Sequence, residues 1–263
     1  MGRVDLLRYD LATAEKLPVI RRLLGSAPPT PCLDVGSGTG DLTVAVFPEA
    51  APVAVDAWLP NLDSIRREHG GQARLLAASG DCLALRGGAI GTLLCSEVLE
   101  HIDDDRAVIA ELARVLRPGG RLVVTVPCLY FGIDTYLRLL RVRSVHDFPG
   151  PERHVRRGYR ESDLRELFGA AGLEVEEVVY LFKPFAKLAI DIVAAAHLVY
   201  QRVVHRRRQW TWSDVATPAM SNSAAFRAYR LLYPLLSSLS IFDRLFRFRG
   251  GFGIAVRATR RAG

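Results

Sequence analysis

Short apolar runs alternate with segments of helical spacing along most of this chain. Runs of strand length cover 32–35, 53–56, 73–77, 92–95 and 121–127, and turn-forming or polar residues bound them. Nearly continuous apolar runs of this length are typical of parallel strands that are buried on both faces. The pattern therefore predicts an α/β fold built on a doubly wound sheet.

Helical segments are expected between and around these runs. A leading helix is predicted over 5–26, a short one over 41–47, and a longer one over 105–116, where apolar residues recur every three or four positions. A further helix over 162–171 precedes an apolar run that begins at residue 173, and a last strand is expected over 252–258. At 263 residues the chain is long enough to bury a substantial core.

A glycine-rich turn follows the first apolar run. Asp34 precedes glycines at 36, 38 and 40, and Asp41 opens the next helix. Glycine permits a sharp turn and lets a ligand lie against the backbone, while the free N–H groups of a helix start attract electron-rich groups. The third glycine comes one residue too early for the G-x-G-x-x-G dinucleotide fingerprint, and Asp41 would repel a pyrophosphate. A nicotinamide dehydrogenase is therefore disfavoured, and an ordinary glycine-rich turn is the plain alternative.

Three motifs together resemble the class I S-adenosylmethionine-dependent methyltransferases over residues 32–127. They are D-x-G-x-G-x-G at 34–40, S-E-V-L-E-H at 96–101 and L-R-P-G-G-x-L at 116–122. The second motif is similar to that of the ubiquinone-biosynthesis-type small-molecule methyltransferases. The resemblance implies a Rossmann-like seven-stranded sheet whose last strand lies antiparallel between strands five and six, and it implies S-adenosyl-L-methionine as cofactor.

The resemblance also places a cofactor site along the ends of the first four strands. Asp56 follows Asp34 by 22 residues, close to the offset of about 20 for a ribose-binding carboxylate, although a helix N-cap would also explain it. Asp81 is expected beside the adenine amino group, with a plain turn as the alternative. The whole set expected to bind the cofactor is Asp34, Gly36, Ser37, Gly38, Gly40, Asp56, Ala57, Asp81, Cys82, Ser96 and Glu97.

Candidate catalytic residues are His101, His154 and Glu97. Methyl transfer from a sulfonium needs a base only where the acceptor must lose a proton. Glu97, Glu100 and His101 share neighbouring helical positions and would offer ligands to a divalent ion, as in the resembled quinone methyltransferases. A capping or packing role for His101 is the preferred alternative, so a metal is not expected.

The chain is expected to divide into a cofactor-binding domain, residues 1–182 and 250–263, and an inserted segment, residues 183–249. The insertion holds 11 Lys/Arg and 3 Asp/Glu, a net charge of +8 within a chain of net charge +7. Two helices are predicted in it, over 186–204 with a polar side that includes Lys187 and Asp191, and over 224–248 with a break at Pro234.

Amphipathic, arginine-rich helices of this kind are typical of interfacial contact with anionic lipid. A helical lid over the active site, or a dimer contact, explains the same pattern, and the sequence leaves these alternatives open. No nucleic-acid-binding module accompanies the basic segment, so nucleic acid is not an expected partner. The N-terminus shows no signal peptide and the four cysteines show no zinc spacing, so a cytoplasmic protein, alone or on the inner face of a membrane, is expected.

These observations predict methyl transfer from S-adenosyl-L-methionine to a small, lipophilic acceptor of quinone or lipid type. One alternative is a soluble natural-product or sugar O- or N-methyltransferase whose insertion is only a lid. A second is a non-catalytic protein that binds S-adenosylmethionine. The sequence does not decide the acceptor, the methylated atom or the oligomeric state.

Overall fold

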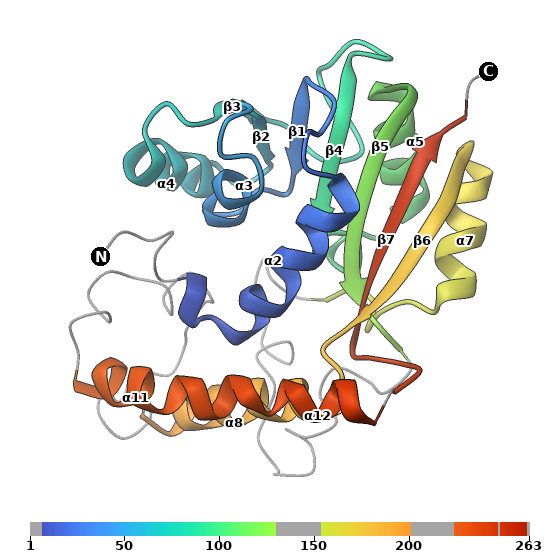
Figure 1. Cartoon of the computed structure of the whole chain (residues 1–263). Coiled ribbons are helices and arrows are strands. Elements are labelled where there is room, and N and C mark those ends of the chain that lie inside the picture. The colour runs from blue at the N-terminus through green and yellow to red at the C-terminus, as the bar shows by residue number, and fades with distance from the viewer. Residues whose placement is uncertain (1–6, 130–153, 201–223, 247, 262–263) are drawn as a thin grey trace.

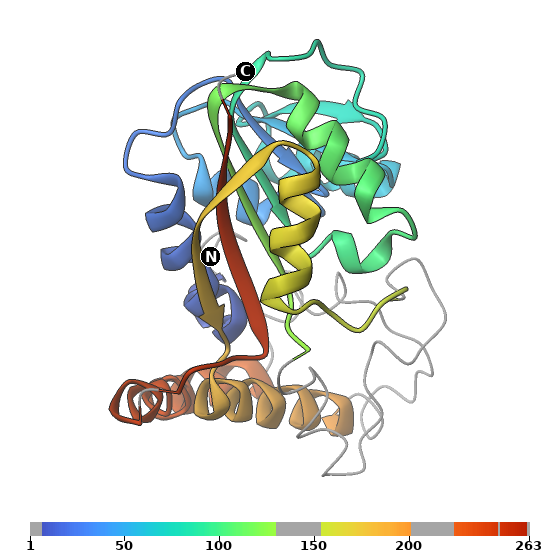
Figure 2. The same ribbon diagram turned by 90° about the vertical axis from the view of Figure 1, so that its right-hand side faces the viewer.

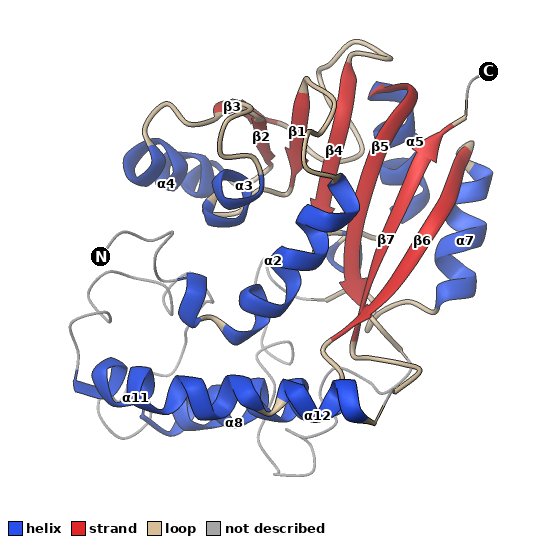
Figure 3. Ribbon diagram, viewed as in Figure 1, coloured by secondary structure: helices blue, strands red, loops and turns tan. Residues whose placement is uncertain are grey.

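The computed structural model describes residues 7–129, 154–200, 224–246 and 248–261. Its centre is a seven-stranded sheet of order β3-β2-β1-β4-β5-β7-β6, in which β7 is antiparallel to both β5 and β6 and the other neighbours are parallel (Figures 1 and 3). This topology confirms the Rossmann-like prediction. The strands are β1 (Cys32–Val35), β2 (Val53–Asp56), β3 (Arg74–Ala77), β4 (Ile90–Ser96), β5 (Leu116–Pro127), β6 (Leu173–Leu181) and β7 (Gly253–Arg260).

Helices cover both faces of the sheet, as Figure 2 shows for α5 and α7 on one side and α2 on the other. Apolar side chains of α5 and α7 share a core cluster with one face of the central strands, and those of α2 and α3 share a second cluster with the other face. The central strands are buried on both faces, which is why they are nearly continuous apolar runs. The bounds are α2 (Leu11–Leu24), α3 (Asp41–Val46), α5 (Asp105–Val115) and α7 (Glu161–Ala170).

Two helical features differ from the expectations. The leading helix begins at Leu11, because the Asp10 carboxylate caps it by accepting from the Ala12 N–H at 3.1 Å, and a separate 3₁₀ turn, η1 (Leu7–Tyr9), precedes it. Helix α4 (Leu59–His69) lies where the pattern predicts no element, since its apolar residues are few. Leu62 and Ile65 nevertheless bury one side of it against β2.

The inserted segment forms three described helices, α8 (Pro184–Tyr200), α11 (Ala224–Ser238) and α12 (Ser240–Leu245). They lie across the end of the sheet at which β4 and β5 finish (Figures 1 and 2). The predicted break at Pro234 is wrong: α11 runs through this residue and ends at Ser238. Pro234 is exposed.

Two residues of the predicted polar side of α8, Lys187 and Asp191, lie inside the protein instead of facing the solvent. Lys187 and Asp191 are 6% and 2% exposed and form an ion pair. The Asp243 carboxylate of α12 accepts from the N–H groups of Phe185 and Ala186 at 3.0 and 2.8 Å, which fixes the start of α8 against α12. These buried polar contacts fix the start of α8 and hold it against α12 within the insertion.

Within the described ranges, no helix combines the length and the apolar character needed to cross a membrane. Cys32, Cys95 and Cys128 are buried free thiols, whereas Cys82 is a free thiol at the surface.

Candidate active site

The glycine turn joins β1 to α3 at the carboxyl end of the sheet. The Gly36 and Ser37 N–H groups donate to the Val55 carbonyl oxygen at 2.8 and 2.9 Å, which holds the turn against β2. Gly36, Gly38 and Gly40 all have positive φ angles. A Cβ on Gly36 would lie 2.2 Å from Val98 Cγ2, whereas nothing lies within 4 Å of the equivalent position at Gly38. The turn is therefore packed on one side and leaves open space at Gly38.

Asp56 lies beside this open space, at the end of β2. Its carboxylate accepts from the Gly38 N–H at 2.8 Å and from the Trp58 N–H at 2.8 Å. A carboxylate can accept about four hydrogen bonds, so acceptor capacity remains for a ligand. The predicted pair of Asp56 and the glycine turn is thus brought together, with Ala57 and Trp58 exposed next to it.

Asp34 and Asp41 lie inside the protein behind the glycine turn. Asp34 is 2% exposed, accepts from Thr43 Oγ1 at 2.5 Å, and has its pKa raised to about 7, mainly by burial. Asp41 accepts from Thr39 Oγ1 at 2.7 Å and contacts His69 Nε2 at 3.0 Å, so its carboxylate is directed at α4. Asp34 is buried behind the turn and bonded to Thr43. Direct contact between Asp34 and a cofactor therefore stays a prediction.

Asp81 and Cys82 are exposed in the turn after β3. The Cys82 N–H donates to the Ser79 carbonyl oxygen at 3.1 Å, and Glu111 of α5 accepts from the Leu83 N–H at 2.7 Å, which anchors the turn. Their roles toward adenine stay predictions.

Ser96 ends β4, Glu97 follows it, and both meet Thr125 of β5. Thr125 Oγ1 lies 2.8 Å from Ser96 Oγ and donates to Glu97 Oε1 at 2.8 Å, while Lys16 Nζ lies 4.0 Å from the same carboxylate oxygen. Glu97 has φ of +56°, a conformation that side-chain-bearing residues rarely adopt and that clusters at functional sites. Sequence reasoning missed Thr125 and Lys16. The only signal was a polar residue within the apolar run 122–127 of β5.

A buried carboxyl group and two imidazoles gather just beyond β4, around the turn η2 (Leu99–His101). Glu100 is 0% exposed, and within the described residues neither of its carboxylate oxygens has a hydrogen-bond partner. Burial and the charge of Glu97 raise the pKa of Glu100 well above its usual range. The Glu100 backbone carbonyl accepts from the Val155 N–H at 2.8 Å, which brings the segment that begins at His154 onto η2.

His101 and His154, predicted separately as catalytic candidates, are neighbours. Their rings pack edge to face with centroids 4.7 Å apart. One carboxylate oxygen of Glu100 and one ring nitrogen each of His101 and His154 lie within 4.8 Å of one another. Glu97, which the sequence placed in the candidate metal set, turns its carboxylate to Thr125 instead. The arrangement can serve proton transfer with no metal, and no step here depends on one.

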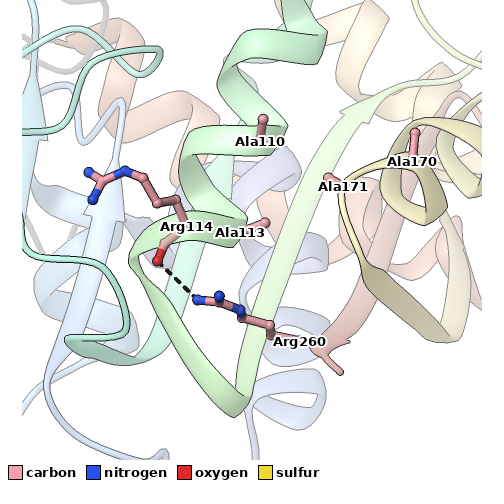
Figure 4. A pocket seen from close by; sticks show the side chains of 6 residues that line it. All are labelled: Ala110, Ala113, Arg114, Ala170, Ala171 and Arg260. Carbon is pink, nitrogen blue, oxygen red and sulfur yellow. Dashed lines mark hydrogen bonds between the residues drawn. The ribbon is translucent and has the colours of Figure 1, made fainter. Parts of the chain in front are cut away.

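A shallow hollow between α5 and α7 lies near the amino end of β5, away from this site (Figure 4). Arg260 closes one side of it by donating to the Arg114 carbonyl oxygen at 3.0 Å. None of the predicted site residues lines it. The residues that do are Ala110, Ala113, Arg114, Ala170, Ala171 and Arg260.

Comparison with known proteins agrees with the fold and the turn. The profile of the family described as "Methyltransferase domain" matches residues 8–178. A ubiquinone biosynthesis O-methyltransferase of Xylella fastidiosa (strain M23) is 35% identical over 159 residues, which cover 56% of this chain and 61% of that protein. A malonyl-[acyl-carrier protein] O-methyltransferase of Hahella chejuensis is 31% identical over 169 residues, covering 63% and 58% respectively.

Among solved structures, a SAM-dependent methyltransferase of Thermotoga maritima matches with a TM-score of 0.57 at 15% identity, covering 97% of this chain and 92% of that one. The aligned regions span about three fifths of the length of the two curated relatives. The chain belongs to the class I S-adenosylmethionine-dependent methyltransferases. The open space at Gly38, bordered by the Asp56 carboxylate, fits a ribose-bearing cofactor of this family.

Asp56→Asn is expected to weaken the binding of S-adenosylmethionine about tenfold to a hundredfold. A charge-assisted hydrogen bond is worth roughly 1.5–3 kcal/mol, and the amide supplies one acceptor oxygen where the carboxylate supplies two. Isothermal titration measures the change. Asp63→Asn on α4, where the carboxylate pairs with Arg66 at the surface, is the control, and equal affinities of the two variants would remove Asp56 from the site.

The stability of the protein is expected to fall as the pH rises from about 4 to about 7. Burial raises the pKa of Glu15 and of Asp34 to about 7, so the folded state keeps protons that the unfolded chain loses near pH 4. The stabilisation is complete below the unfolded pKa and is lost as the pH passes the folded one. Asp34→Asn should flatten the dependence of the unfolding temperature on pH, whereas Asp63→Asn should leave it unchanged. An equally steep profile for Asp34→Asn would contradict the assignment.

Proposed function

We propose that the protein transfers the methyl group of S-adenosylmethionine to a hydroxyl oxygen of a small, lipophilic, quinone- or lipid-like acceptor. One arrangement carries the proposal: the Gly38–Asp56 cradle and the His101–His154 pair lie at the same end of the sheet, joined through Val98, which packs on Gly36. The cited relatives are named O-methyltransferases, which supports oxygen as the methylated atom.

The cofactor, when bound, supplies a methyl carbon activated by a sulfonium. The chain must align the acceptor oxygen with that carbon and exclude water, because an in-line displacement depends chiefly on proximity. As the oxygen–carbon bond forms and the carbon–sulfur bond breaks, the hydroxyl proton needs an acceptor, and we assign this role to the imidazole of His154 with His101 packed against it. The buried carboxyl of Glu100 lies beside the two rings, with one oxygen within 4.8 Å of a nitrogen of each.

Incubation with labelled S-adenosylmethionine and a panel of quinols, phenols, sugars and amines tests this proposal. Methylation of hydroxyl groups on lipophilic members is the expected result. Preferential methylation of sugars or amines would favour a soluble natural-product methyltransferase. Cofactor binding with no transfer to any member would favour a non-catalytic binding protein.

A further inference from the structure

Helices α11 and α12 turn apolar side chains outward, away from the protein. Leu231, Leu235 and Leu245 are 83%, 67% and 72% exposed. Several large apolar side chains exposed on two adjoining helices are unusual, and such a group marks an interaction site. We call this surface the outer face. It consists of Leu231, Leu232, Leu235, Ile241, Phe242, Leu245 and Phe246, each at least 46% exposed. The rings of Phe242 and Phe246 also contact the Phe185 ring of α8 on one side, with centroids 5.5 and 5.9 Å away.

Helix α11 packs on the protein through one side and exposes the other, so the outer face is not a packing side left without a partner. The opposite side of α11 is packed: the Tyr229 hydroxyl donates to the Tyr9 carbonyl oxygen, and the Tyr233 ring meets the Tyr9 ring edge to face at 5.3 Å between centroids. Asp243 fixes α12 to the start of α8. The helix pair is therefore held in the orientation that exposes its leucines.

Basic residues border the outer face on one side. At 100° per residue, Leu231 and Leu235 lie within about 40° of each other, while Arg227 and Arg230 follow on one flank. Both arginines are exposed. The guanidinium of Arg230 lies over the Tyr9 ring, 5.3 Å from its centroid, and would leave that ring to reach a lipid phosphate. An apolar strip with a cationic edge matches a lipid surface, whose acyl region and phosphate layer present these two chemistries side by side.

The charge of the chain agrees with this partner. The segment 183–249 carries a net charge of +8, whereas the remainder carries −1, with 24 basic and 25 acidic residues. A second copy of the same strongly basic segment would be repelled from it, whereas an anionic surface would be attracted. The segment also lies across the end of the sheet that carries the candidate active site (Figures 1 and 2).

We propose that the outer face of α11 and α12 docks onto an anionic lipid bilayer, with its leucines and phenylalanines among the acyl chains and Arg227 and Arg230 at the lipid phosphates. Docking would hold the active-site end of the sheet toward the membrane, where a lipophilic acceptor is concentrated. The inference goes beyond the proposed methyl transfer, because binding needs neither cofactor nor acceptor.

Co-sedimentation with vesicles tests it on the whole protein, without cofactor. The protein is expected to bind vesicles of phosphatidylcholine mixed with phosphatidylglycerol. The double variant Leu231→Glu/Leu235→Glu should lose about a hundredfold or more in vesicle affinity, since two charges would enter the acyl region. Leu59→Glu, at a leucine of α4 that is 61% exposed, is the matched control and should bind normally.

The arginines are tested separately from the leucines. Arg227→Gln/Arg230→Gln should reduce the affinity for the anionic vesicles about tenfold or more, near the effect of two phosphate-layer charges, and should change binding to phosphatidylcholine alone much less. Equal binding of the wild type and Leu231→Glu/Leu235→Glu would overturn the proposal. So would a dimer in sedimentation equilibrium that this double variant dissociates, in a protein that binds no vesicles, because the outer face would then be a contact between copies.

Discussion

Gly36→Ala is expected to lower the affinity for S-adenosylmethionine more than a hundredfold, the largest effect of any single methyl group added to this chain. The φ angle of Gly36 is +73°, and a Cβ there would lie 2.2 Å from Val98 Cγ2. The left-handed backbone costs roughly 1–2 kcal/mol for an alanine, and relief of the contact must move either the turn or Val98. Because the Gly36 N–H also holds the turn to Val55, any such movement displaces the cradle at Gly38.

Gly88→Ala separates the two causes. Gly88 has φ of +71°, almost the same as Gly36, but nothing lies within 4 Å of its Cβ position, and it lies away from the cradle. This variant should lose a similar backbone contribution to stability and keep its cofactor affinity. Calorimetric titration and thermal unfolding of both variants measure the difference. If Gly36→Ala bound the cofactor as well as Gly88→Ala, the turn would not be the cofactor site.

His154→Gln is expected to lower kcat by about a hundredfold to ten-thousandfold, the usual contribution of a general base, and to leave the dissociation constant of S-adenosylmethionine unchanged. The variant is measured with an acceptor that the wild type methylates. A loss confined to KM would make His154 an acceptor-binding residue, and wild-type turnover would remove it from the site altogether. Glutamine keeps a hydrogen-bonding side chain but cannot take the proton at neutral pH.

Two further variants test whether the effect of His154→Gln is specific and whether it is coupled to His101. Arg157→Gln, at an exposed residue of the same segment, should keep its kcat and so exclude a general disturbance of the chain after His154. His101→Gln should also lose activity, and the double variant should lose less than the sum of the two free-energy changes, because the rings are in contact at 4.7 Å. Additive losses would mean that the two imidazoles act independently.

The strands and the turn that carry the candidate site follow from local sequence. The positions of the strand ends and of the glycine turn could be predicted from the sequence, because the apolar runs are short and sharply bounded. The topology at Asp56 brings that residue to Gly38, as the spacing implied. The contact between His101 and His154 could not be read, because it depends on how the segment after residue 153 folds back onto the Glu100 carbonyl.

The orientation of the insertion lay beyond sequence reasoning for a related reason. An amphipathic helix can bury either side, and which side it buries depends on the partners that the fold supplies. Here Lys187 pairs with Asp191 inside the protein, and Glu15 of α2 accepts from the Phe182 N–H at 2.6 Å where the chain enters the insertion. The Phe182–Glu15 contact joins residues far apart in the sequence, so the spacing of residues within α8 alone does not predict that Lys187 and Asp191 lie inside the protein.

Titration of the purified protein with S-adenosylmethionine, with NAD as the control ligand, tests the central claim most directly. The account predicts binding of S-adenosylmethionine in the micromolar range, lost in Gly36→Ala and weakened in Asp56→Asn, with no binding of NAD. Binding of neither ligand by the wild type, or binding of NAD alone, would contradict the assignment of the Gly38–Asp56 cradle as a methyltransferase cofactor site.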